Sequence, residues 1–208
     1  MADPTGDPRR EGSQPAAPPS RGQAARRRLL DAAVELLAER GLERVNSNQI
    51  AKAAGVGVGT FYAHFPDKYA IQQAVVLEVL EQLGERVEAA ARQPAPDRAS
   101  QVRRSVEAAL DFAVESPGRF RAAFAHEIAT SPGRPGIAPS PRRLERRLRG
   151  LQVQGRLDPE LDPAVAAKGF TSMQTAVILW WLDDPARAER THVIETLVRL
   201  HPAVAAAR

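Results

Sequence analysis

The stretch from residue 46 to residue 65 constrains the fold most, because it encodes two short helices and the turn that joins them. Asn46 is a favourable N-cap for a helix over 46–54, and Gln49, three residues later, completes a capping box that satisfies two backbone amides. Gly55 can adopt the left-handed conformation that commonly ends a helix. The first of the two helices is therefore predicted with a defined end on each side.

The second short helix is predicted over 58–64, after a short turn. Phe61 and Phe65 fall on its buried side, which leaves Tyr62 outside, and Pro66 breaks the helix. Two short helices joined by a glycine-containing turn predict a helix-turn-helix, whose second helix can enter the major groove of DNA.

The outer face of this second helix combines small side chains with hydrogen-bond donors. Gly57, Gly59 and Ala63 would let the helix backbone come close to DNA. Thr60 and Tyr62 can donate hydrogen bonds to phosphates or to base edges. These residue types in this order predict a recognition helix.

Basic residues flank the motif on both sides. His64 and Lys68 are predicted where the phosphate backbone of DNA would pass. Residues 26–28 are three arginines at the start of an earlier helix, and phosphate contact and simple solvation are equally good interpretations of them. The arginine-rich stretch 142–149 is better interpreted as a solvated helix face, with Leu144, Leu148 and Leu151 pointing inward.

Apolar residues at helical spacing predict helices throughout the remaining chain, and no stretch favours a β-strand. The predicted helices cover about 26–40, 67–91, 98–115, 117–130, 141–154, 163–182 and 185–200, with breaks at 93–97 and 131–141. Asp67 is the predicted cap of the helix that follows the motif. The fold class predicted is all-α.

Composition narrows the function classes. The formal net charge of +4 and the pI near 10.1 favour an acidic partner such as nucleic acid, although only three of the 29 basic residues are lysines. The absence of cysteine excludes disulfide scaffolds, cysteine nucleophiles and thiolate metal sites. No cofactor and no metal site is expected, since His126-Glu127 begins like a zinc-protease motif but Thr130 replaces the second histidine.

Residues 1–20 are rich in Pro, Gly and Ser with little to bury, and they are predicted to be a disordered tail. The N-terminus lacks the apolar core of a signal peptide, and no apolar run reaches the roughly 20 residues that a membrane helix requires. A cytoplasmic protein without membrane contact is the expectation.

Several spaced elements together resemble the DNA-binding domain of the TetR family, over about residues 24–75 without a gap. They are Leu29-Leu-Asp-Ala-Ala33, Leu37-Ala-Glu-Arg-Gly41, Ile50-Ala-Lys-Ala-Ala-Gly-Val56, Gly59-Thr-Phe-Tyr-Ala-His-Phe65 and Lys68. The chain departs from the family where a lysine is frequent, at Val58, and where a small polar cap is usual, at Gly57. Val58 could instead meet a thymine methyl group.

The resemblance implies a regulator with an N-terminal three-helix DNA-binding domain at 21–70, including the motif at 46–65, and a C-terminal ligand-binding and dimerisation domain at 71–208. The implied DNA-contacting residues are Asn46, Ser47, Asn48, Gly57, Val58, Gly59, Thr60, Tyr62, His64 and Lys68. The implied partners are a double-stranded operator, a second copy of the chain and a small-molecule effector. Repression is the family's usual direction.

Two further sets belong to the C-terminal domain. Residues that could line a ligand cavity or simply fill the core are Phe112, Phe120, Phe124, Met173 and Trp180. By resemblance, the last two helices form a four-helix interface between two copies, through Val177, Trp181, Ile194 and Leu197.

Two alternatives of different kinds stay open. The first is a DNA-binding protein without an effector, whose C-terminal domain serves dimerisation alone. The second is a helical enzyme, which is weakened because the sequence offers no paired carboxylates, no nucleophile with its base and no metal-ligand spacing. The glycines at 55, 57 and 59 follow a helix instead of a strand, so they do not fit a nucleotide-binding loop.

Overall fold

The computed structural model describes residues 20–125 and 141–206. These residues form helices joined by short connections, and no strand occurs in them, which confirms the all-α fold class. Some expectations concern residues outside these two ranges. They are the N-terminal tail up to residue 19, the 131–141 loop except Pro141, the end of the 117–130 helix, and His126-Glu127. The helices are α1 (Arg21–Arg40), α2 (Ser47–Ala53), α3 (Val58–His64), α4 (Lys68–Arg92), α5 (Arg98–Glu115), α6 (Pro117–Phe124), α7 (Arg142–Val153), α8 (Pro163–Asp183), α9 (Arg190–Leu200) and α10 (Pro202–Ala205), with short 3-10 helices η1 (Leu42–Arg44) and η2 (Pro185–Arg187).

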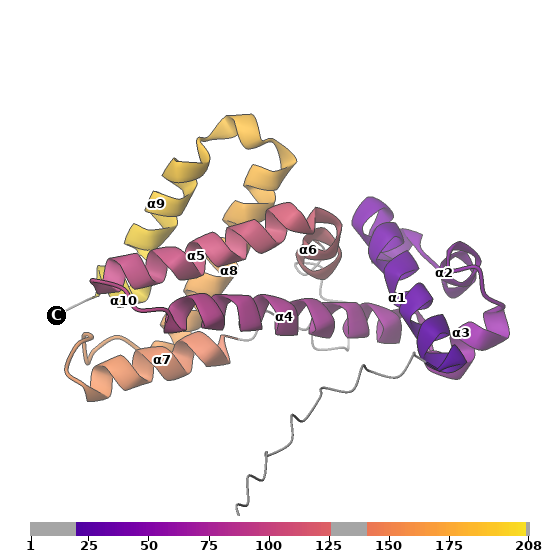
Figure 1. The fold of residues 1–208 in the computed structure, drawn as a ribbon, viewed down its shortest axis with the longest axis horizontal. Helices are drawn as coiled ribbons and strands as arrows, with labels where there is room; N and C mark the ends of the chain where they lie inside the picture. Colours follow the sequence, from indigo (N-terminus) through magenta and orange to yellow (C-terminus); the bar gives the residue numbers. More distant parts are fainter. Residues whose placement is uncertain (1–19, 126–140, 207–208) are drawn as a thin grey trace, which may run out of the picture.

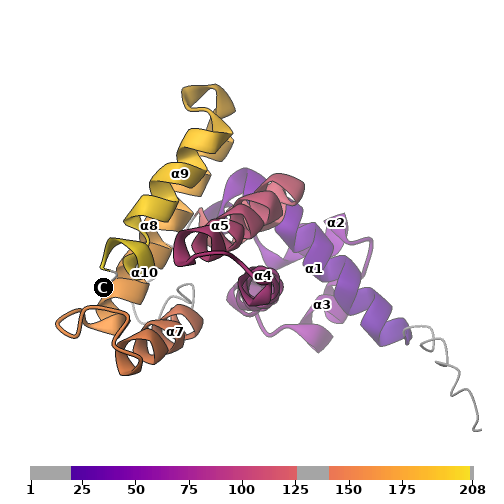
Figure 2. The same ribbon diagram turned by 60° about the vertical axis from the view of Figure 1, so that its left-hand side comes forward.

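The helices divide between two ends of an elongated molecule (Figure 1). Helices α1, α2 and α3 gather at one end, and α7 to α10 lie at or toward the other. Helix α4 runs from α3 into the second group and packs against α5 (Figure 1). The turned view looks nearly down the axis of α4, with α5 beside it (Figure 2). The 25 residues of α4 span about 38 Å at 1.5 Å per residue, so this helix is long enough to reach from one end to the other.

Local capping explains where several helices begin. Asn46 Oδ1 accepts a hydrogen bond from the Gln49 N–H at 2.9 Å, and the Asn46 N–H donates to Gln49 Oε1 at 2.9 Å, which confirms the predicted capping box. Asp67 accepts from the Ala70 N–H at 2.8 Å and so caps α4, as predicted. Ser20, the last residue of the predicted tail, is the N-cap of α1 and forms a capping box with Gln23.

The predicted helix over 185–200 is wrong at its start. Pro185–Arg187 form the 3-10 helix η2, and α9 begins only at Arg190. Asp184 accepts a hydrogen bond from the Ala186 N–H at 3.1 Å, which stabilises this tight turn instead of a continuous helix. Proline at position 185 is suited to the first residue of a helical turn, because it needs no N–H partner there. The short helix α10 was not predicted.

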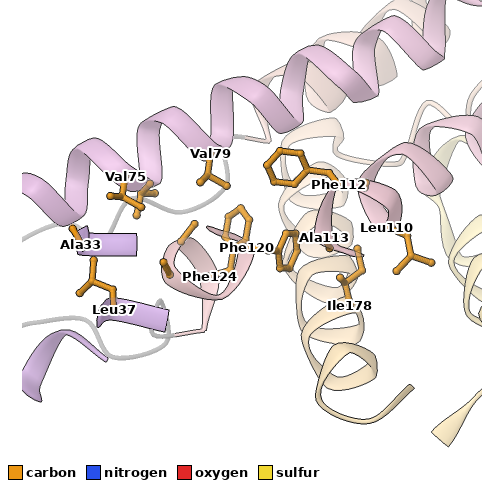
Figure 3. Packing of buried hydrophobic residues seen from close by; sticks show 14 of the residues in the cluster. Ala33, Leu37, Val75, Val79, Leu110, Phe112, Ala113, Phe120, Phe124 and Ile178 are labelled. Atoms are coloured by element: carbon orange, nitrogen blue, oxygen red, sulfur yellow. The ribbon is translucent and has the colours of Figure 1, made fainter. Parts of the chain in front are cut away.

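A single apolar core runs through the molecule, and α6 joins its two ends. Helix α6 packs against both α1 and α4. Its Phe120 and Phe124 are fully buried with ring centroids 4.7 Å apart, and Figure 3 shows them near Ala33 and Leu37 of α1. The α1–α3 end is therefore packed directly onto the C-terminal helices, and not only tethered by α4.

A buried histidine begins α10. His201 is 6% exposed, and its Nδ1 accepts a hydrogen bond from the Ala203 N–H at 3.1 Å. Its ring packs edge-on against Phe170 with centroids 4.4 Å apart. Burial, and then the positive charge of Arg147, lower the pKa of His201 to about 3, so this cap is a neutral imidazole at ordinary pH. No motif in the sequence marks this residue.

Candidate nucleic-acid interface

Helices α2 and α3 are held on α1 by a few fully buried side chains. Ile50 and Ala51 of α2 and Phe61 of α3 have no exposed surface, and α1 contacts both helices. The Phe61 ring meets Tyr62 edge-on at 5.4 Å and Phe65 at 6.0 Å between centroids. Phe61 on the buried side is confirmed, and this anchoring holds the opposite face of α3 outward.

The turn between α2 and α3 depends on one left-handed glycine. Gly55 has φ of +64°, a conformation that residues with a Cβ rarely adopt. Its N–H donates to the Lys52 carbonyl at 3.1 Å, and the Val56 N–H donates to the Ala51 carbonyl at 3.0 Å. This pair of bonds is a Schellman motif, which ends α2 and sends the chain into α3.

The outward face of α3 has little side-chain bulk near its start. Gly57, Val58, Gly59 and Ala63 are exposed, and Tyr62 is 54% exposed, as expected for an outer position. A Cβ placed on Gly59 would meet no atom within 4 Å, so packing inside the chain does not require glycine there. A partner outside the chain can approach the backbone of α3 closely at this point.

The polar residues around α3 differ in their exposure to solvent. Thr60 and His64 are half-buried, whereas Asn48 at the start of α2 is exposed and Ser47 is half-buried. Asn46 is exposed, but its side-chain oxygen Oδ1 accepts from the Gln49 N–H. The structure places all these residues on or beside the helix-turn-helix.

Lys68 has an internal role that the sequence did not indicate. Its Nζ donates a hydrogen bond to the Leu42 carbonyl at 2.9 Å, and it lies 5.4 Å from the centre of the Tyr69 ring. The ammonium group thus ties the start of α4 to η1, just before α2. Its effect on DNA binding would include the placement of α2.

The three arginines near the start of α1 are not equivalent. Arg26 lies over the Phe65 ring at 5.3 Å from its centre, and Arg27 forms ion pairs with Asp31 and Glu78. Arg28 is exposed. Two of the three side chains therefore have partners inside the protein, and Arg28 is the one best placed for solvent or phosphate.

The residues expected to line a ligand cavity do not all face one interior. Phe112, Phe120 and Phe124 are buried together between α4, α5 and α6 (Figure 3). Met173 is half-buried on α8. Trp180 is instead 46% exposed on the outer side of α8, where the Arg187 guanidinium lies 5.6 Å from its ring centre.

The residues expected at a dimer interface lie mostly inside the single chain. Ile194 and Leu197 are buried, and Trp181 is 7% exposed with its Nε1–H donating to the Ala188 carbonyl at 2.9 Å. Val177 is half-buried. The neighbouring Trp180 takes the outward position, because successive helical residues are about 100° apart around the axis.

A family model of bacterial regulatory proteins, the tetR family, matches residues 29–75, which span most of α1, all of α2 and α3, and the beginning of α4. The chain belongs to the TetR family. It is a DNA-binding transcriptional regulator with an N-terminal helix-turn-helix and a helical C-terminal domain. The resemblance stated from the motif residues is thereby confirmed.

Curated relatives extend the likeness beyond the motif. The HTH-type transcriptional regulator UidR of Escherichia coli is 27% identical over 164 residues, which cover 75% of this chain and 81% of that protein. The nucleoid occlusion factor SlmA of Glaesserella parasuis is 30% identical over 101 residues, about half of each chain.

Solved structures share the fold over most of the chain. A TetR-family regulator from Shewanella superposes with a TM-score of 0.73 at 20% identity, covering 88% of this chain and 98% of that one. The complex of SmeT with triclosan, whose TM-score is 0.62 at 22% identity, covers 85% of this chain and 90% of that one. Within the described residues, no helix is long and apolar enough to cross a membrane.

Proposed function

We propose that this regulator is a homodimeric repressor, which binds a pseudo-palindromic operator and leaves it when a small molecule binds. The observation that carries the proposal is the exposed, sparsely covered face of α3. Gly57 and Gly59 let the helix enter the major groove closely, and Thr60, Tyr62 and Val58 contact base edges or the nearest phosphates. The DNA-binding domain in this proposal is 21–70, and 71–208 is the effector and dimerisation domain.

The flanks of α3 position the helix on the phosphate backbone. Asn46, Ser47 and Asn48 at the start of α2 lie on one side, and His64 and Lys68 at the junction with α4 lie on the other. Such contacts hold the protein in register without reading sequence. The Lys68 contribution passes partly through η1, which its ammonium group holds at 2.9 Å.

Dimerisation is proposed through the outward face of α8. Exposed uncharged residues recur there at helical spacing, at Val165, Gly169, Ser172, Ala176 and Trp180. This face replaces the predicted set of Trp181, Ile194 and Leu197, which the chain's own core already uses. Two copies joined there would present two α3 helices to half-sites roughly 34 Å apart, one turn of DNA.

The effector is proposed to be a small apolar or aromatic molecule. Phe112, Phe120 and Phe124 are buried on the helices α5 and α6 that meet α4, and Met173 of α8 packs against the same apolar core. Because α6 also packs on α1, a ligand that shifts α6 alters the position of the DNA-binding domain. Release requires that the ligand bind the DNA-free arrangement more tightly than the DNA-bound one. The triclosan complex of SmeT supports this class of ligand.

A gel shift on DNA upstream of the protein's own gene, followed by footprinting, tests the proposal. We expect a specific shift at low salt and a footprint with two related half-sites. A panel of apolar and aromatic molecules is then scored for loss of the shift. Absence of any specific shift at low salt would refute the operator proposal, and a shift that every ligand leaves intact would favour a regulator without an effector.

The dimer face has its own test in Ala176→Arg. A charged side chain on an apolar interface is left desolvated and unpaired, so the variant should sediment as a monomer while keeping its helical content. Glu85→Arg, an exposed charge reversal on α4, is the control and should stay dimeric. A dimeric Ala176→Arg variant would place the interface elsewhere.

A further inference from the structure

Glu78 of α4 is held by arginines from two other helices at once. Its Oε1 accepts a hydrogen bond from Arg27 Nη1 of α1 at 2.8 Å and from Arg119 Nη2 of α6 at 2.8 Å. Gln82, one turn further along α4, donates to the same oxygen at 3.2 Å, and its own Oε1 accepts from Arg119 Nη1 at 3.1 Å. We call Arg27, Glu78, Gln82 and Arg119 the three-helix cluster.

The cluster is partly shielded from water. The side chains of Glu78 and Arg119 are 24% and 21% exposed, whereas Arg27 is 52% exposed. Burial by itself raises the pKa of the Glu78 carboxyl, but the hydrogen bonds from Arg27 and Arg119 outweigh it, so that the pKa is lowered. Glu78 is therefore charged at neutral pH and can hold both arginines.

The apolar contacts around the cluster restrain the angle between α1 and α6 less than its hydrogen bonds do. Gly118 of α6 lies against Val34 of α1, where an added Cβ would sit 4.0 Å from a Val34 methyl group. Apolar burial is non-directional and so resists separation of α1 and α6 more than rotation between them. Hydrogen bonds to a carboxylate prefer a narrow range of angles, so the cluster supplies the angular restraint.

A small rotation of the DNA-binding domain about Glu78 would displace α3 by a distance that matters on DNA. Glu78 lies ten residues beyond Lys68, the first residue of α4, which is about 15 Å along the helix. The recognition helix α3 directly precedes that end. A turn of about 13° about Glu78 would move α3 by about 3.4 Å, the rise of one base pair.

We propose that Glu78 is a positioning residue, which sets the half-site spacing that the protein accepts by locking the DNA-binding domain to α6. The inference rests on the proposed dimer, because spacing has meaning only for two joined recognition helices. Loss of the lock would let each DNA-binding domain turn, so the protein would tolerate operators with altered spacing. A role in stability alone would lower binding to all spacings by the same factor.

The experiment measures spacing discrimination. Operators selected by the wild-type protein from random DNA are rebuilt with one base pair added or removed between half-sites, and affinities are read by fluorescence anisotropy. The variants are Glu78→Gln and Arg119→Gln, the second of which removes the α6 partner without touching α1 or α4. Glu88→Gln is the matched control, because Glu88 also lies on α4 and pairs with Arg143 of α7 at 3.1 Å.

Wild-type protein and Glu88→Gln should prefer the native spacing strongly, and this preference should fall about tenfold in Glu78→Gln and in Arg119→Gln. Circular dichroism checks that each variant is folded, and if Glu78→Gln fails to fold, Arg119→Gln decides. If the folded variants keep the wild-type preference for the native half-site spacing, this inference alone is overturned. A wild-type protein that binds no paired half-sites at any spacing overturns the proposed dimeric function, and this inference with it.

Discussion

Gly59→Ala should make the protein more stable and a poorer DNA binder. Gly59 is the second residue of α3 and is exposed, and a Cβ built on it meets no atom within 4 Å. Its φ is not positive, so alanine can adopt the same backbone. Alanine is favoured over glycine in a helix by about 0.5–1 kcal/mol, which corresponds to a rise of about 1–4 °C in Tm for a chain of this size.

The effect on DNA binding should have the opposite sign. The new methyl group stands on the face that Val58 and Tyr62 share and would hold the α3 backbone away from the groove floor. We expect at least about a tenfold loss of operator affinity, or about 1.4 kcal/mol. Thermal unfolding by circular dichroism and anisotropy titration on the footprinted operator measure the two effects on one sample.

Gly150→Ala is the control that separates the effect on stability from the effect on operator binding. Gly150 lies within α7, and a Cβ on it would also meet no atom within 4 Å. It should gain similar stability and bind DNA as the wild-type protein does. If Gly59→Ala binds the operator unchanged, close approach by the α3 backbone is wrong. A destabilised Gly59→Ala would contradict the open space assigned to this position.

Three further predictions follow from buried or exposed side chains. Phe61→Ala should lower the free energy of unfolding by about 3–5 kcal/mol in urea melts, because its ring is fully buried, and a loss below 1 kcal/mol would contradict its anchoring role. Tyr62→Ala should leave Tm nearly unchanged but weaken operator binding, since Tyr62 is exposed; equal affinity would show that α3 docks differently. The pKa of His201 is 6.5 in the unfolded chain and about 3 in the native state, so between these values the unfolded chain binds a proton that the native protein does not. Stability should therefore fall by about 1.4 kcal/mol per pH unit as pH drops below about 6.5, relative to His201→Asn, which keeps a capping acceptor. Parallel pH–stability curves for the two proteins would refute it.

Short-range patterns determined much of the DNA-binding domain. The capping box of Asn46 and Gln49 and the stop at Gly55 act between residues three to five apart, so the sequence alone located α2. Phe61 inside and Tyr62 outside follow from helical periodicity once the helix is located. The same reasoning placed Leu148 inward and left most of the arginines of α7 toward solvent.

Longer-range features were decided only by tertiary packing. The sequence suggested Trp180 for a ligand cavity and Trp181 for a dimer interface, but the angle at which α8 packs on its neighbours turns Trp180 outward and buries Trp181. Lys68 meets a carbonyl 26 residues away, and Glu78 meets arginines 51 and 41 residues away. No local pattern encodes such partners, because they depend on how whole helices cross. The helix-turn-helix is thus determined by its own residues, whereas its orientation on the molecule comes from contacts that form only when the chain is folded.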